Sequence, residues 1–173
     1  MTEPSGTASH RAAAAARTAR CAVITVTDSR TRKTDQSGPL ACVLLEREGH
    51  TVSHTALLPN VEPRVREEVA WLIARDDIDV VILTGGTGLG ERDRTVEAVR
   101  PLFEKELPGF GELFRWVSFH EQIGTAAILT RATAGVAHGT LIVSLPGSKA
   151  AVDLALNRLL LPELKHLLHE LRR

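Results

Sequence analysis

Short apolar runs alternate with longer amphipathic stretches along this chain of 173 residues. Four of the apolar runs have the length and side-chain types typical of β-strands: residues 21–27, 50–58, 79–84 and 140–145. The first, CAVITVT, fits a strand buried on both faces of a sheet. The pattern therefore predicts four strands that pair inside the molecule, with helices between them.

The stretches between the strands have helical spacing. Helices are predicted at 39–49, 62–77, 95–107, 108–122 and 149–173, whereas residues 124–139 are ambiguous and can hold a helical turn plus a short strand. Leu40, Val43 and Leu44 share one face of the first helix, which Gly49 ends. The second helix begins near Pro63, and its apolar stripe consists of Val65, Val69, Leu72 and Ile73.

Strands that alternate with helices predict an α/β fold, a three-layer αβα arrangement around a mostly parallel central sheet. No internal repeat or linker interrupts the sequence after residue 20, so we expect a single domain over residues 21–173. Residues 1–20 are polar and alanine-rich, and a disordered or loosely ordered tail is expected there. Pro162 is expected to kink or restart the last helix.

Composition and charge limit the classes of partner. Lys and Arg total 21 residues and Asp and Glu also total 21, a balance that gives no support for a partner of nucleic acid or membrane. No apolar run approaches the ~20 residues of a transmembrane helix. The residues around Cys21 and Cys42 complete no zinc site, so both are expected to be buried free thiols in the cytoplasm.

Three of the four strands end in polar or glycine-containing loops: TDSR after the first, TGGTGLGERDRT after the third, and SLPGSK after the fourth. The carboxyl ends of parallel strands meet at one edge of the sheet, where ligands of such folds bind. We therefore expect one crevice to collect Asp28, Ser29, the glycine run, Asp93, Ser148 and Lys149.

The glycine loop at 84–95 matches neither of two well-known phosphate-binding patterns. The dinucleotide pattern GxGxxG fails because Glu91 stands where its third glycine is required. The P-loop pattern fails because Glu91 and Arg92 replace its lysine and hydroxyl residue. Gly85, Gly86 and Gly88 still permit a backbone nest of N–H groups that binds anions. Four glycines in six residues favour ligand binding over a plain turn.

The polar residues beside the glycines leave alternatives open. Asp93 either shares a divalent cation with bound phosphates or complements the dipole of the next helix. Thr95 is a good N-cap for that helix, whose positive end would add to the anion site. In the loop after the fourth strand, Ser148 and Lys149 either bind a second anion or shape a solvated turn.

Other candidates for chemistry are weaker. His50 and His54 have the spacing of a helical zinc pair, but they lie in a predicted strand, which separates them too far. His166 and His169 are expected to face solvent on the last helix. Two tryptophans, Trp71 and Trp116, occupy helical positions where core packing is expected, and no Ser–His–Asp set can be assembled.

Five motifs in order carry a family resemblance: TGGTG, RDRTVEA, LPGFGELFR, TAAILTRATAGV and LIVSLPGS. Together they resemble the MoaB/MogA family of molybdenum cofactor biosynthesis, whose domain recurs in gephyrin and plant Cnx-type proteins. The similarity runs from about Cys21 to the last helix, and residues 109–142 are most similar to the MoaB branch.

The resemblance implies a molybdopterin-binding α/β fold and a homotrimer or a hexamer built of trimers. Members with established chemistry transfer AMP from Mg-ATP to the terminal phosphate of molybdopterin and release pyrophosphate. Asp93 would be the functional carboxylate, acting with Mg²⁺. The pterin and nucleotide pocket would be lined by Gly85, Gly86, Thr87 and Gly88 and completed by Asp28, Ser29, Pro146, Gly147 and Ser148.

Three departures from the family pattern bear on activity. Val96 replaces a helix-opening proline, and Lys149 follows the PGS sequence where proline is more usual. Asn60 stands where the adenylylating branch carries aspartate, so its carbonyl oxygen can contact a cation but brings no charge. The sequence thus predicts a molybdopterin adenylyltransferase, with a non-catalytic molybdopterin carrier as the alternative. A nucleotide-sensing scaffold is a third reading.

Overall fold

The computed structural model describes residues 18–173. Six strands form one sheet in the order β2-β1-β3-β6-β5-β4. Their bounds are Arg20–Val26 (β1), Thr51–Leu58 (β2), Val80–Thr84 (β3), Lys105–Glu106 (β4), Thr133–Ala137 (β5) and Thr140–Leu145 (β6). β1, β2, β3 and β6 pair in parallel, whereas β5 and β4 are antiparallel to their neighbours.

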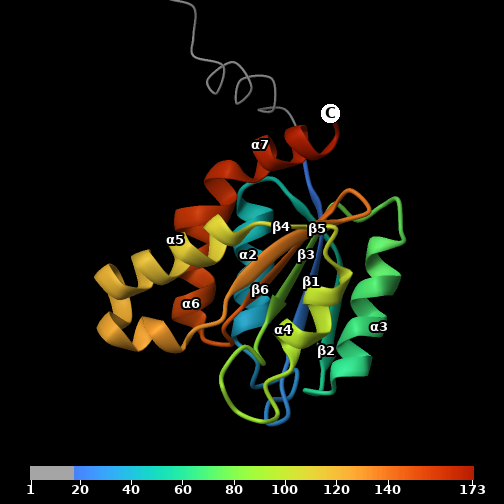
Figure 1. Ribbon diagram of the computed structural model, residues 1–173. Coiled ribbons are helices and arrows are strands. Elements are labelled where there is room, and N and C mark those ends of the chain that lie inside the picture. The colour runs from blue at the N-terminus through green and yellow to red at the C-terminus, as the bar shows by residue number, and fades with distance from the viewer. Residues whose placement is uncertain (1–17) are drawn as a thin grey trace, which may run out of the picture.

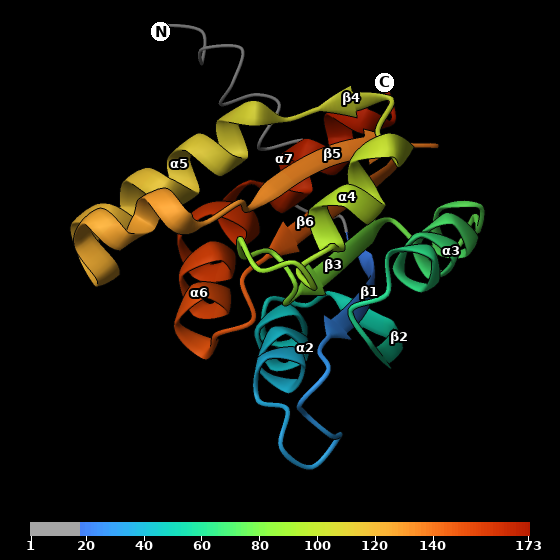
Figure 2. The same ribbon diagram turned by 60° about the horizontal axis from the view of Figure 1, so that its bottom comes forward.

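Helices cover both faces of this sheet (Figures 1 and 2). The α-helices are α2 (Ser37–Arg47), α3 (Glu62–Ile73), α4 (Thr95–Val99), α5 (Pro108–Ser118), α6 (Lys149–Leu154) and α7 (Leu161–Leu171). Short 3₁₀ segments cover Arg100–Leu102 and Gly124–Leu129, and π-helical turns cover Phe119–Ile123 and Ala155–Leu160. In both views α3 and α4 lie on one side of the sheet, and α2, α5 and α6 on the other.

Each face of the sheet has its own apolar core because strand side chains alternate between the two faces. Val23 and Ile82 point into the larger core, which they share with α2, α5, α6 and α7. Ile24 and Leu83 belong to the smaller core, against α3 and α4. The expected three-layer αβα arrangement with a mostly parallel sheet is confirmed.

The four predicted strands are confirmed, and the ambiguous segment 124–139 contains the 3₁₀ segment and strand β5. Gly49 follows the end of α2 with a φ of 81°, as a helix-ending glycine does. The helix predicted at 95–107 was too long, because Pro101 lies in a 3₁₀ turn and the two-residue strand β4 follows.

Several predicted side-chain positions were wrong. Trp71 and Trp116 do not pack in the core: they are 49% and 60% exposed. Trp71 instead lies against His54 and under the guanidinium of Arg75. Val43 is 59% exposed, because the buried face of α2 passes through Leu44 and Leu45. In each case the helical period was correct, but the apolar face was assigned too wide.

Both cysteines are free thiols, as expected. Cys21 is fully buried, and burial raises the pKa of its thiol to about 12. Cys42 is only partly buried, which corrects that part of the prediction. The tail predicted at 1–20 lies almost entirely outside the described residues, and among residues 18–173 no helix has the length and apolarity needed to cross a membrane.

Candidate functional site

A cavity of about 580 Å³ opens at the carboxyl end of the parallel strands. Its walls include residues from all three loops that the sequence placed there: Asp28 and Ser29 after β1, Gly85–Gly88 and Asp93 after β3, and Pro146–Ser148 after β6. Asn60 joins them from the loop after β2. The convergence of distant loops on one crevice is thus a feature of the structure, as parallel topology requires.

In the loop after β3, neighbouring atoms of the protein occupy the space that a side chain at each of these glycines would need. A Cβ on Gly85 would lie 2.1 Å from the carbonyl oxygen of Val26. At Gly86 the same atom would lie 2.3 Å from Asn60 Oδ1, and at Gly88 2.6 Å from Asp93 Oδ2. Close approach of main chain and side chains therefore requires these glycines, and it brings Asn60 and Asp93 against the loop.

Three successive residues of the loop line the cavity and have unpaired backbone N–H groups. The N–H groups of Gly86, Thr87 and Gly88 have no hydrogen-bond acceptor within residues 18–173. Gly85 and Gly86 adopt φ values of 106° and 65°, a turn that few other residues could form. Unpaired N–H groups in consecutive residues with such geometry are typical of an anion-binding nest.

Asp93 is partly buried and lines the cavity. Its Oδ2 accepts a hydrogen bond of 3.1 Å from the Gly90 N–H, and no side chain caps α4. The carboxylate therefore closes its own loop and does not bond to the first amides of the helix. This geometry leaves the second carboxylate oxygen available to a ligand or cation, and the place of Asp93 just before α4 is also compatible with complementing the helix dipole.

Asn60 and Asp28 form a pair at the mouth of the cavity. Asp28 accepts hydrogen bonds from the backbone N–H of Asn60 (2.9 Å) and from its Nδ2 (3.3 Å), and Arg92 lies 3.0 Å from the same carboxylate. The backbone hydrogen bond from Asn60 is the main cause that lowers the pKa of Asp28. Asn60 Oδ1 is buried and has no hydrogen-bond partner within the described chain.

The structure corrects one predicted role, that of Thr95, and places Ser148 and Lys149 differently with respect to the cavity. Thr95 is not the N-cap of α4: it is the first helical residue, it is fully buried, and its Oγ1 donates to the Gly85 carbonyl at 2.8 Å. Ser148 lines the cavity, but its Oγ caps α6 by accepting from the Ala151 N–H. Lys149 is exposed and does not line the cavity.

Arg131 holds the glycine loop from outside the cavity. Its guanidinium donates to the carbonyl oxygens of Thr87 (3.2 Å) and Asp93 (3.0 Å) and forms an ion pair with Glu97. The hydrogen bond from Arg131 is the main reason that the pKa of Glu97 is lowered. The Arg131 side chain therefore fixes the loop at two points, one near the end of β3 and one near the start of α4.

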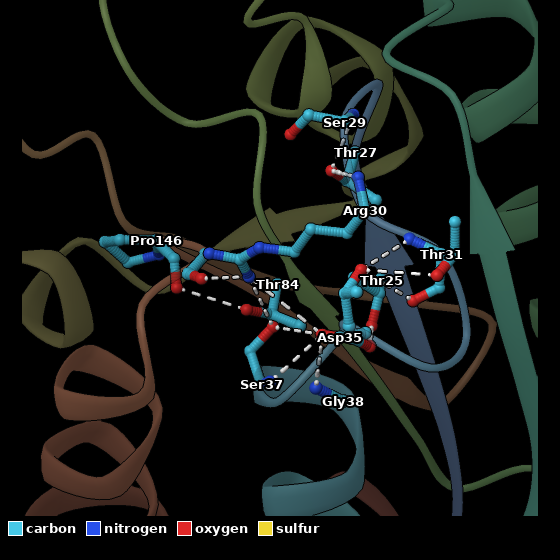
Figure 3. Close-up of polar contacts among 12 residues, drawn as sticks. Thr25, Thr27, Ser29, Arg30, Thr31, Asp35, Ser37, Gly38, Thr84 and Pro146 are labelled. Atoms are coloured by element: carbon cyan, nitrogen blue, oxygen red, sulfur yellow. Dashed lines mark hydrogen bonds and ion pairs between the residues drawn. The ribbon is translucent and has the colours of Figure 1, made fainter.

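A second set of polar contacts, around Asp35, fixes the loop after β1 (Figure 3). Thr25 Oγ1 donates to Asp35 Oδ2 at 2.6 Å, and Ser37 donates to Oδ1 through its backbone N–H and its hydroxyl. Arg30 lies 3.9 Å from the carboxylate and donates to the Gly147 carbonyl at 2.7 Å. The network thus joins the first loop to the loop after β6.

Asp35 was missed at the level of sequence because it looked like one more charge in a polar loop. We expect Asp35→Asn to lower the free energy of unfolding by about 2 kcal/mol at pH 7, because hydrogen bonds to a charged acceptor are lost. Burial alone would raise the pKa of Asp35, but the donated hydrogen bonds outweigh it and lower the pKa.

The carboxylate's contribution is therefore complete above about pH 4 and disappears as the pH falls through the lowered pKa of the folded state. Urea denaturation at pH 7 and in acid measures both effects. A gap between wild type and Asp35→Asn that persists in acid would contradict this account.

The far wall of the cavity was also missed. It comes from α5 and the turns that follow, and its members are largely apolar: Phe114, Ser118, Gln122, Ile123, Ala126 and Leu129. The sequence pattern does not predict this wall, because residues 124–139 could not be assigned to a helix or a strand near the crevice. A cavity with a polar loop on one side and an apolar wall on the other suits a ligand with a flat ring and a phosphate.

The fold and this cavity define an α/β protein of the class whose ligand sites lie at the carboxyl edge of a parallel sheet. Residues 22–166 match the family described as probable molybdopterin binding domain. The chain therefore belongs to the MoaB/MogA family of molybdenum cofactor biosynthesis, as its motifs predicted.

Similar proteins agree with this assignment. The chain is 48% identical over 154 residues to molybdenum cofactor biosynthesis protein B of Bacillus subtilis, an alignment that covers 89% of this chain and 91% of that protein. Among solved structures, a molybdenum cofactor biosynthesis protein B has a TM-score of 0.88 at 43% identity, covering 91% of this chain and 98% of that one. The tungsten cofactor synthesizing protein MoaB from Pyrococcus furiosus has a TM-score of 0.81 at 39% identity, with 91% and 99% covered.

Proposed function

We propose that this protein binds molybdopterin and transfers AMP from Mg-ATP to the terminal phosphate of the pterin. The observation that carries the proposal is the row of unpaired N–H groups at Gly86–Gly88 beside two oxygen ligands, Asp93 and Asn60 Oδ1. Such a site can hold phosphates and a divalent cation together. The family relationship supplies the pterin as the substrate class.

In this proposal, different residues of the cavity bind the two ends of the ligand. The glycine loop would hold phosphate oxygens, because its N–H groups need acceptors. The apolar side chains Phe114, Ile123 and Leu129 would pack against the pterin ring. Arg131, bonded to Thr87 and Asp93, keeps the loop in place while the ligands change.

Mg²⁺ fits this site only as the partner of a nucleotide. Within residues 18–173 no cluster of three or more His, Cys, Asp or Glu side chains could hold a metal by itself. One carboxylate, Asp93, and one amide oxygen, Asn60 Oδ1, suit a cation whose other ligands are phosphate oxygens and water. When bound, the cation would neutralise the charge that builds up on the phosphates.

In the transfer, an oxygen of the pterin phosphate attacks the α-phosphorus of ATP. A new P–O bond forms there, the bond from the α-phosphorus to the bridging oxygen breaks, and pyrophosphate leaves with its electron pair. No protein nucleophile is needed, so catalysis consists of positioning two anions and neutralising their charge.

The alternative is a carrier that binds molybdopterin without turnover, and Asn60 is the observation that favours it. One assay separates the two: purified protein is mixed with molybdopterin and Mg-ATP, and pyrophosphate release is followed. Release above background supports the enzyme. Pterin binding without release would leave the carrier as the function.

Substitution Asn60→Asp tests the contribution of the missing carboxylate. The new oxygen would replace an Nδ2 that donates to Asp28 at 3.3 Å, so two carboxylates would repel each other. We expect Asn60→Asp to lower the melting temperature without Mg²⁺, to recover with Mg-ATP, and to release pyrophosphate severalfold faster.

A control for this variant lies outside the cavity lining. Asn157 Nδ2 also donates to an aspartate, Asp153, at 2.9 Å, and neither residue lines the cavity. Because Arg47 donates to Asn157 Oδ1 at 2.9 Å, Asn157→Asp should lose less stability, with no response to Mg-ATP. Equal Mg²⁺ responses in the two variants, or an unchanged rate for Asn60→Asp, would contradict the metal argument.

We further propose that the protein assembles as a homotrimer or as a hexamer that is a dimer of trimers. Exposed apolar side chains gather on α5 and the turns after it: Leu113, Trp116, Phe119, Ile123, Ile128 and Leu129. Apolar surface of this extent typically marks a protein interface. Light scattering of the purified protein tests the proposal, and a monomer at micromolar concentration would contradict it.

A further inference from the structure

A second cavity of about 520 Å³ lies next to the candidate site. It is bounded by α4 and the 3₁₀ turn after it, by the start of α5, and by the segment leading into β5. Thr130 lines both cavities, so the two share a wall. The proposed adenylyl transfer assigns no role to this second space.

Three arginines line the second cavity, and two of them are already paired. Arg100 forms an ion pair of 2.7 Å with Glu106, and Arg131 pairs with Glu97. Arg115, on α5, is partly buried, yet its guanidinium has no hydrogen bond or ion pair with any of residues 18–173. It is therefore a cation that lines a cavity and lacks an acceptor.

A second polar group in the same wall also lacks a partner. Thr130 Oγ1 is buried and makes no hydrogen bond within the described chain. Buried polar groups are normally satisfied, and an unsatisfied hydroxyl costs on the order of 1–3 kcal/mol. Thr130 thus adds an unsatisfied hydroxyl to the wall between the two cavities, and the Arg115 guanidinium, which lines the second cavity without an acceptor, is the group that indicates a missing anion.

We propose that the second cavity is a binding site for a phosphate group, with Arg115 as its main ligand. The planar fork of a guanidinium donates two parallel hydrogen bonds to phosphate, which makes arginine well suited to this group. The phosphate belongs either to free phosphate or pyrophosphate or to a small organic phosphate, since the cavity has room for both.

One carboxylate sets the affinity of this site. Glu112 lines the same cavity one helical turn before Arg115, and the two side chains form no ion pair. A carboxylate without its own cation repels a bound phosphate. Removing that charge should therefore tighten binding, whereas removing the Arg115 charge should weaken it.

The test follows the Arg115 Nε–Hε resonance by NMR while inorganic phosphate, pyrophosphate or AMP is added to the full-length protein. The Arg115 resonance is assigned as the Nε–Hε signal that is missing from the spectrum of Arg115→Gln. We expect a saturable shift with at least one of the three anions. Calorimetry should show about tenfold weaker binding of that anion to Arg115→Gln, and severalfold tighter binding to Glu112→Gln.

Arg64→Gln is the control for loss of one positive charge, because Arg64 lies on α3 outside both cavities. It should bind as wild type does. A response to inorganic anions identifies the free ion as the ligand, and a response to AMP alone identifies an organic phosphate. No shift with any of the three, or equal affinities of wild type and Arg115→Gln, would overturn the proposal.

This test stands apart from the adenylyl transfer. Asp93 lines the first cavity and not the second, so the Arg115 titration should be unchanged in Asp93→Ala. If Asp93→Ala abolished the shift of Arg115, the anion would be bound in the first cavity, and the second site would be refuted whatever the outcome of the pyrophosphate assay.

Discussion

Asp93→Ala should reduce pyrophosphate release by about two orders of magnitude or more, the usual loss when a group that stabilises transition-state charge is removed. Of the two aspartates that line the cavity, Asp93 is the one whose carboxylate has no side-chain partner, since Asp28 is bonded to Asn60 and Arg92. Without it, an ATP-bound cation would lose its one charged protein ligand in the proposed site.

The fold should tolerate this change. The Asp93 carboxylate accepts a single hydrogen bond, from the Gly90 N–H, so its removal should cost about 1 kcal/mol of stability. Asp153→Ala, on exposed α6 surface, is the matched control and should release pyrophosphate at the wild-type rate. Stopped turnover in both variants, or retained turnover in Asp93→Ala, would remove Asp93 from the mechanism.

Gly85→Ala should destabilise the protein by about 3 kcal/mol or more, because the new Cβ has no space and the backbone is strained. Its Cβ would lie 2.1 Å from the Val26 carbonyl oxygen, a backbone atom that cannot rotate away. The φ of 106° adds a conformation that alanine disfavours. The variant also moves the nest, so ligand binding should fall with stability.

Gly49→Ala separates the two causes. Gly49 has a φ of 81°, but a Cβ there would meet no atom within 4 Å. Its substitution should therefore cost only the backbone term, about 1 kcal/mol. Chemical denaturation of both variants measures the difference. Equal losses would show that the close packing of Gly85 against β1 does not matter.

The sequence predicts the four parallel strands because each is a short apolar run bounded by polar loops, whereas the two antiparallel strands β4 and β5 lack this pattern. The parallel order of these strands predicts that Asp28, Gly86, Asp93 and Gly147 meet at one edge of the sheet, as they do. This prediction needs only the topology, because it depends on which end of each strand a loop follows and not on side-chain contacts.

Contacts between distant side chains could not be predicted. Arg30, Asp35 and Gly147 are joined in three dimensions, yet nothing in their spacing marks a pair. Thr95 matched the N-cap pattern, but the Gly85 carbonyl competes for its hydroxyl. Tertiary partners decided these roles, and local preference did not.

Helical spacing also gave the wrong exposure for apolar side chains that lie on the surface of α5. Trp116 and Leu113 follow helical spacing, and a monomer would bury such residues. Their exposure on α5 agrees with the proposed oligomer. The cytoplasmic location and the absence of a nucleic-acid partner stay predictions from composition and charge.

The central claim is that the cavity at the sheet edge transfers AMP to molybdopterin, and detection of the product tests it most directly. Wild-type protein and Asp93→Ala are each incubated with molybdopterin and Mg-ATP, and adenylyl-molybdopterin is measured by mass spectrometry. The account predicts product with wild type, at a stoichiometry equal to the pyrophosphate released, and almost none with Asp93→Ala. Bound molybdopterin that stays unmodified in the wild-type protein would contradict it.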